Sequence, residues 1–297
     1  MKNILFATTA LVATAGIAAA DVSLSGAANV GIINDGTAGA ETDMYQNMSI
    51  TATMSGETDG GLTFGATLSV RNGDDVDLDV GDLGDNTSGA IAPLSATSFG
   101  SVFVSGDFGT ITFDRDGIDN VHNDDFSHDV SYAYSAGALS VTVTADIDND
   151  GAAYADGEEF AAKVVYSAAP VTVTVATDDS GEADATLAYA LNDMIGLSVN
   201  FDTDGQGAES ETIVKATYAN GGISAHLALA DDDDDQWEIG LGYTAGALTL
   251  GAVFAENDGA GDTEMDITAS YDLGGGMAIK AATNESGAYF VGTALAF

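Results

Sequence analysis

A unit of about 27 residues recurs along this chain, and in each unit a tyrosine precedes a small or glycine-rich turn. The tyrosines are Tyr134, Tyr166, Tyr189, Tyr218, Tyr243 and Tyr271. Their spacings are 32, 23, 29, 25 and 28 residues, and Phe297, the last residue, follows Tyr271 by 26 residues. Longer segments rich in Asp, Gly and Asn lie between these turns, as at 146–151 and 231–235. One unit therefore holds two strands of about ten residues, one short turn and one acidic loop.

Within each unit, apolar and polar residues alternate with a period of two. Three stretches carry the pattern most clearly, with apolar residues at Val141, Val143 and Ala145, at Val171, Val173 and Val175, and at Leu62, Phe64, Ala66, Leu68 and Val70. Thr, Ser and Gly fill most of the positions between them. This alternation and the enrichment in β-branched and aromatic residues predict strands with one apolar face.

Short turns that alternate with longer loops indicate antiparallel hairpins. A strand of about 9–11 residues is long enough to cross a bilayer when tilted, and outer-membrane barrels place short turns on one side and longer loops on the other. The sequence therefore predicts an all-β fold, a transmembrane antiparallel β-barrel with short periplasmic turns and acidic extracellular loops. Tyr134, Tyr166, Tyr189, Tyr218, Tyr243, Tyr271 and Phe297 would form an aromatic girdle at the short-turn end. A secreted β-sandwich or β-solenoid is the alternative fold.

The strand number follows from the turns. Short turns are expected near 56–61, 106–109, 136, 168, 191, 221, 245 and 274. Eight such turns give 2 × 8 + 2 = 18 strands.

The charge balance excludes several classes of protein. The chain has 47 acidic and 6 basic side chains, a formal charge of −41, no Cys and 45% hydrophobic residues. So few basic residues argue against nucleic acid as a partner, because phosphates need cations to neutralise them. Without Cys there is no disulfide framework and no cysteine-ligated metal. The apolar content is too high for a disordered chain.

Residues 1–20 have the features of a cleaved signal peptide. Lys2 gives the positive start, an apolar stretch runs from Ile4 to Ala15, and Ala18–Ala20 fits a cleavage site of small residues. The barrel domain is then 21–297, and its charge is 5 − 47 = −42. After Asp21 no run of 18 apolar residues occurs, so transmembrane helices are not expected.

The five remaining basic residues test which face of each strand is apolar. Lys163, Lys215, Lys280 and Arg71 fall on the parity opposite to the tyrosines and large aliphatic residues of their strands, and the fifth base is Arg115. A charge facing lipid costs about 2–4 kcal/mol at the bilayer midplane. We therefore expect these four side chains to face the lumen.

Several segments resemble the trimeric general porins of alphaproteobacterial outer membranes. They are MSGETDGGLTFGATLSV (54–70), VFVSGDFGTITF (102–113), YSAGALSV (134–141) and ASYDLGGGMAI (269–279), and they occur in the family's order. The carboxyl end, with Phe297 preceded by Leu295, Val291 and Tyr289, is similar to the signal that the barrel-assembly machinery recognises. The resemblance implies a water-filled homotrimeric barrel in outer-membrane lipid, calcium among surface acids, and sixteen strands. Sixteen to eighteen strands are thus expected.

The resemblance also implies a constriction made by the third extracellular loop, folded inward. Its position after 102–113 places this loop at 114–129, although the longer stretch at 72–96 could share the role. The constriction residues would be the loop residues Asp114, Arg115, Asp116, Asp119, Asp124, Asp125 and Asp129 and the wall residues Arg71, Lys163, Lys215 and Lys280. The strand at 45–54 has no Arg, so the acidic side should dominate.

Two groups of residues could hold metal ions. Asp146, Asp148 and Asp150 precede Gly151 with the spacing that opens a calcium loop, but the twelfth position is Gly157 rather than Glu, so this is no EF-hand. Structural calcium is therefore an expectation of the acidic loops. His122 and His128 lie among aspartates, where a transition-metal site is conceivable, but solvated histidines are the more common case.

No catalytic arrangement emerges, because the chain has no GxSxG motif and three His in all. We therefore expect no enzyme but an outer-membrane porin, a water-filled and cation-preferring channel for passive diffusion of small hydrophilic solutes. The alternative is a secreted calcium-binding acidic β-rich cell-surface protein. A barrel enzyme is a third hypothesis.

The mature protein should begin at Asp21, because the residues before it match a signal peptide and its cleavage site. The intact mass of the protein extracted from outer membranes with detergent checks this. A membrane-bound species that keeps residues 1–20 would contradict it.

Overall fold

The computed structural model describes residues 21–37, 39–74, 93–122, 127–147, 159–203, 210–231, 236–256 and 263–297, with the backbone alone at 74, 93–99 and 116. These residues form 18 strands. The first nine are β1 (Asp21–Asn34), β2 (Asp43–Glu57), β3 (Thr63–Asp74), β4 (Pro93–Gly106), β5 (Gly109–Asp119), β6 (Ser127–Ala136), β7 (Leu139–Ala145), β8 (Phe160–Ala168) and β9 (Val171–Asp178). The second nine are β10 (Ala183–Ala190), β11 (Ile195–Thr203), β12 (Glu211–Asn220), β13 (Ile223–Asp231), β14 (Trp237–Ala245), β15 (Leu248–Glu256), β16 (Thr263–Gly274), β17 (Met277–Asn284) and β18 (Tyr289–Ala296). Within the described ranges, no helix is long and apolar enough to span a membrane.

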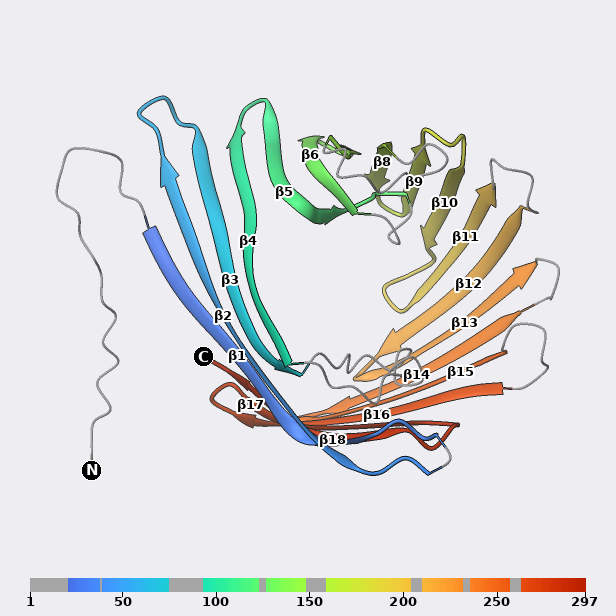
Figure 1. The fold of residues 1–297 in the computed structure, drawn as a ribbon. Helices are drawn as coiled ribbons and strands as arrows, with labels where there is room; N and C mark the ends of the chain where they lie inside the picture. Colours follow the sequence, from blue (N-terminus) through green and yellow to red (C-terminus); the bar gives the residue numbers. More distant parts are fainter. Residues whose placement is uncertain are drawn as a thin grey trace.

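The strands form one closed antiparallel sheet. Each strand pairs with the next in sequence, and β1 pairs with β18 in a register that sets Ile32 opposite Val291. The strands ring an open interior, with the blue first strand beside the red last strand (Figure 1). Phe297 completes the seam, since its N–H donates to Gly26 O at 2.8 Å and its carbonyl accepts from Gly26 N at 3.2 Å. The predicted β-barrel is confirmed.

Eight short connections lie at one end of the barrel, at the positions that the sequence predicts. They occupy 58–62, 107–108, 137–138, 169–170, 191–194, 221–222, 246–247 and 275–276. The strand number is therefore 18, as the turns predict, and the sixteen strands that the resemblance implies are wrong for this chain. Leu62 lies in the first turn rather than in a strand, because β3 begins at Thr63.

Two expected loops are shorter than the sequence indicates, because the strands extend into them. The stretch at 72–96 narrows to 75–92, since Asp74 pairs with Pro93 at the ends of β3 and β4. The expected loop at 114–129 is largely strand, because Ile118 pairs with His128 and extends the β5–β6 hairpin.

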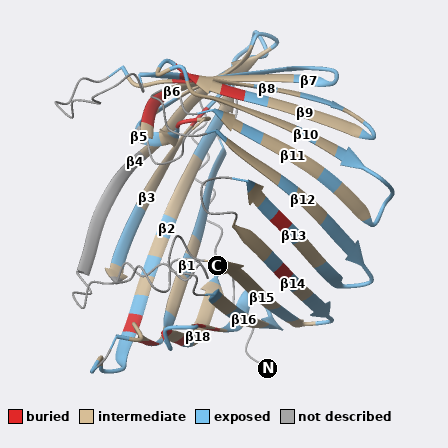
Figure 2. Ribbon diagram, turned by 90° about the vertical axis from the view of Figure 1, so that its right-hand side faces the viewer, coloured by how far each residue is buried: buried red, intermediate tan, exposed pale blue. Residues whose placement is uncertain are grey.

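The two faces of the sheet differ as the alternation predicts. On β13, Leu227 and Leu229 are 41% and 50% exposed, whereas the Ala228 between them is 9% exposed. Exposed and less exposed bands follow one another along most strands, and fully buried residues are few (Figure 2). The described residues contain one small buried cluster, made of Ile33, Tyr45, Ala282, Ala288 and Phe290. A closed sheet of this kind has an apolar outer belt in place of a central hydrophobic core.

The turn between β12 and β13 offers a matched test of backbone strain. Gly221 and Gly222 both have positive φ, 59° and 86°, where alanine costs about 1–2 kcal/mol. A Cβ at Gly222 would also overlap the backbone carbonyl oxygen of Thr244, whereas one at Gly221 would have no atom within 4 Å.

We therefore expect Gly222→Ala to lower the free energy of unfolding by about 1 kcal/mol more than Gly221→Ala does, because its Cβ meets rigid backbone. Urea unfolding of the reconstituted barrel measures both losses. Equal losses would show that the turn relaxes without cost.

Candidate permeation pathway

The inner face of the barrel carries hydroxyl and amide groups that pair across neighbouring strands. Four hydroxyl pairs lie at 2.8–3.1 Å, Thr51–Ser69, Ser105–Thr110, Ser135–Ser140 and Ser167–Thr172. Asn29 Nδ2 donates to Asn47 Oδ1 at 3.0 Å. These residues alternate with the exposed large apolar residues of the same strands. The inner wall is therefore polar and keeps bound water in contact with a passing solute.

Five basic residues were predicted to line the constriction, and four of them lie on this polar face. Arg71 stands opposite Ser49, Lys163 opposite Ala176, Lys215 opposite Ala228, and Lys280 opposite Ser270. Their chain neighbours Val70, Val164, Val214 and Ile279 are 39–48% exposed on the other face. The bases lie on β3, β8, β12 and β17, and no two of these strands are neighbours. They therefore do not form one basic cluster.

Lys215 lies close to an acidic side chain on the wall. Its Nζ lies 3.7 Å from Glu238 Oε1, and the same oxygen lies 2.5 Å from His226 Nε2. Lys215 belongs to β12, Glu238 to β14 and His226 to β13. Gly240 stands opposite His226 and makes room for its ring, because a Cβ at this position would overlap the ring. Sequence reasoning missed Glu238 and His226, although each falls on the polar parity of its strand. The carboxylate of Glu238 therefore offsets the positive charge of Lys215 on this part of the wall.

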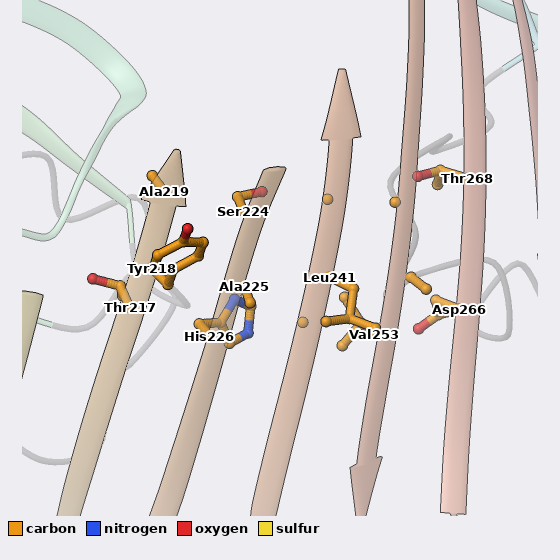
Figure 3. Close-up of a pocket in the computed structure, with 14 residues that line it drawn as sticks. Thr217, Tyr218, Ala219, Ser224, Ala225, His226, Leu241, Val253, Asp266 and Thr268 are labelled. Carbon is orange, nitrogen blue, oxygen red and sulfur yellow. The ribbon is translucent and has the colours of Figure 1, made fainter. Parts of the chain in front are cut away.

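A hollow in the wall adjoins this cluster (Figure 3). It holds about 370 Å³ and is lined by Thr217, Ser224, His226, Asp266 and Thr268, among others. Gly240, Gly242 and Gly251 contribute no side chains to it, and a Cβ at Gly242 or Gly251 would overlap Ser224 Oγ or Thr268 Oγ1. Small residues on the inner parity thus keep the lumen open.

The far end of the β5–β6 hairpin bends away from β4 and toward β9 (Figure 1). Pairing of β5 with β4 stops at Phe113, and its pairing with β6 shifts register between Phe113 and Ile118. Beyond the shift, His122 lies 3.5 Å from Asp178 Oδ2 of β9 and 3.9 Å from Asp184 Oδ2 of β10. Residues 114–122, here called the inward segment, therefore reach β9 and β10, four and five strands along the sheet from β5.

The predicted constriction residues of this hairpin differ in how far they are buried. Asp114 is half-buried, and Arg115 and Asp119 are exposed. Asp129 is buried, and its Oδ2 accepts a hydrogen bond from Ile147 N at 3.1 Å, so it ties β6 to the end of β7. The side chain of Asp116, and Asp124 and Asp125, lie outside the described residues.

The predicted calcium and girdle residues can be placed in part. Asp146 follows β7, whereas Asp148 and Asp150 lie outside the described residues. The girdle residues share the exposed apolar parity next to the short turns, with Tyr134, Tyr166, Tyr189, Tyr218, Tyr243 and Tyr271 39–49% exposed and Phe297 76% exposed. Their role as an interfacial girdle stays a prediction.

Comparison with known proteins identifies the family. Residues 7–288 match the family model described as Gram-negative porin. The chain belongs to this family. The porin is 28% identical to the porin of Rhodobacter capsulatus in an alignment 292 residues long, which covers 87% of this chain and 92% of that protein.

Solved structures agree with the fold. Two mutants of the Rhodopseudomonas blastica porin superpose with TM-scores of 0.57 and 0.55, at 21% and 20% identity, and cover 93% of this chain and 100% of theirs. Membership of the Gram-negative porin family makes this protein an outer-membrane porin channel. None of these matches supports the alternative of a secreted calcium-binding cell-surface protein.

Proposed function

We propose that this porin forms a cation-preferring channel for passive diffusion of small hydrophilic solutes. The observation that supports the proposal is the inward segment, which carries the acids Asp114 and Asp119 and ends with His122 against Asp178 and Asp184 of the wall. Fixed charges at the narrow part of a pore decide which ion enters.

The overall charge acts in the same direction. Without residues 1–20 the chain has 47 acidic and 6 − 1 = 5 basic side chains. Each exposed charge acts over a Debye length of about 8 Å at physiological salt, and dense acidic clusters raise the local concentration of cations. The long-loop end should therefore collect cations before they reach the inward segment.

The wall bases oppose this effect weakly. Lys215 shares its surroundings with Glu238, and Arg71 and Lys280 lie on strands far from β9 and β10 in the sheet order. Lys163 is the wall base nearest the acids of β9 and β10, because Lys163 and Asp184 both pair with Ala176. One base beside several carboxylates leaves the acidic side in excess.

Further parts of the proposal rest on the family and the sequence. The apolar outer face contacts outer-membrane lipid, and three copies assemble into a homotrimer. The signal peptide 1–20 directs export, and the strand ending at Phe297 is recognised by the barrel-assembly machinery. Apart from structural calcium at Asp146, Asp148 and Asp150, we propose no cofactor.

The selectivity is measured as a reversal potential across a planar bilayer in a KCl gradient. The unmodified porin should prefer K⁺ over Cl⁻, more strongly at low salt, where screening is weaker. The double variant Asp114→Asn/Asp119→Asn should reduce that preference while the channel still opens. The control Asp59→Asn/Asp193→Asn removes the same charge from exposed positions at the short-turn end and should leave the preference nearly unchanged.

Anion preference in the unmodified porin would mean that the fixed acids lie away from the permeation path. An equal loss in both double variants would contradict the role of the inward segment. Loss of preference only after neutralising acids in 74–85 would move the constriction to that part of the chain.

A further inference from the structure

His122, at the end of the inward segment, lies in a pocket of carboxylates. Its Nδ1 is 3.5 Å from Asp178 Oδ2 and its Nε2 is 3.9 Å from Asp184 Oδ2. The side chains of His122 and Asp178 are 6% and 0% exposed, and that of Asp184 is 28% exposed. Two sets of three residues bring their ligand atoms within 4.8 Å of one another, His122 with Asp184 and Asp202, and His122 with Asp178 and Glu182. Each ring nitrogen thus faces its own pair of acids.

Four polar atoms of this pocket are buried without hydrogen bonds. Both nitrogens of His122, Asp178 Oδ2 and Asp184 Oδ1 have no hydrogen-bond partner among the residues that the structure describes. A buried polar atom in this state costs about 1–3 kcal/mol, and more when the group is charged. Four such atoms in one pocket therefore indicate a ligand that satisfies them together.

The surrounding structure orients the groups toward one another. Asp178 Oδ1 accepts hydrogen bonds from Ser180 N at 3.0 Å, Ser180 Oγ at 2.6 Å and Glu182 N at 3.2 Å, so Oδ2 is left to face His122. His122 N donates to Asn120 Oδ1 at 2.9 Å, and Asn120 is itself buried. The turn after β9 and the end of the inward segment thus hold the two side chains in fixed positions.

The negative charges of the carboxylates in this pocket also favour the binding of a cation. Asp184 and Asp202 stand directly opposite each other on β10 and β11, and like charges in such a pair are destabilising. Asp178 and Glu182 lie on the other side of the ring. Lys163 pairs with Ala176, which also pairs with Asp184, so Lys163 supplies one positive charge near the pocket.

We propose that His122 Nε2, Asp184 and Asp202 bind one Zn²⁺ ion, and that Asp178 is a positioning residue. Zinc commonly takes imidazole nitrogen and carboxylate oxygen together, and a site with three protein ligands leaves a fourth place for water. Calcium, by contrast, takes oxygen ligands. Asp178 Oδ2 lies 3.5 Å from His122 Nδ1, and on metal binding it would accept a hydrogen bond from the Nδ1–H and so fix the tautomer that leaves Nε2 free for the metal.

Binding is tested by calorimetric titration of ZnCl₂ into the metal-stripped porin in detergent. The unmodified porin should bind one ion per chain, and His122→Gln and Asp202→Asn should each weaken binding at least about 100-fold. Asp178→Asn should weaken it about 10- to 100-fold, because it removes an outer partner rather than a ligand. His226→Gln is the control, since His226 is a wall histidine beside the carboxylate of Glu238 but belongs to β13, which β12 separates from β11.

Two further readouts separate metal ligation from a structural role. X-ray absorption at the zinc edge should show one imidazole among oxygen ligands, with zinc–nitrogen distances of about 2.0–2.1 Å. Calcium in excess should not displace the zinc. Circular dichroism and heat-modifiable mobility establish that each variant is folded, and Asp202→Asn tests the site if His122→Gln does not fold.

Unchanged zinc affinity in folded His122→Gln or Asp202→Asn, displacement by calcium, or an equal loss in His226→Gln would each overturn the proposal. These binding results do not depend on ion preference, so they stand apart from the selectivity measurement.

Discussion

Every backbone N–H and C=O of a chain in lipid has to find a partner within the protein, because no water is available there. In this porin the pairing of β1 with β18 meets that requirement for the sheet as a whole. Asn29 stands opposite Ala294 in this seam, and the two hydrogen bonds between Gly26 and Phe297 carry the pairing to the end of the chain. Once the seam is closed, one face of every strand is outside and the other is inside. The apolar belt, the polar wall and the place of each charge follow from that division.

The interior is shaped by small residues and by one departure from regular pairing. Gly240, Gly242 and Gly251 keep the wall hollow beside His226. After Phe113, β5 loses β4 as a partner and turns into the interior, because the register of the β5–β6 hairpin shifts there. The segment after Phe113 carries Asp114 and Asp119 and sets His122 against the carboxylates of β9 and β10. The chemistry of the pore is thus concentrated where the sheet is least regular.

The sequence predicts the regular part of this structure well, since the tyrosine spacing and the period-two alternation report on hairpins and faces. All eight short turns, the 18 strands and the inward parity of Lys163 and Lys215 could be read from it. The meeting of His122 with Asp178 and Asp184 could not, because residues 114–129 appear as a loop and the register shift after Phe113 leaves no mark in the alternation. The contacts of Lys215 and His226 with Glu238 were missed for a related reason, since the stagger between strands depends on closure of the whole barrel.

The division into a lipid face and a water face can be measured along one strand, because the chain contains no Cys and single thiols can be introduced freely. Cysteine replacements at each position from 213 to 218 of β12 would be labelled with a fluorophore in the reconstituted porin. Labels at Ile213→Cys, Lys215→Cys and Thr217→Cys should be quenched by a water-soluble quencher. Labels at Val214→Cys, Ala216→Cys and Tyr218→Cys should be quenched by a lipid-bound one. Quenching without alternation, or with the two sets exchanged, would contradict a barrel with a polar lumen and an apolar lipid face.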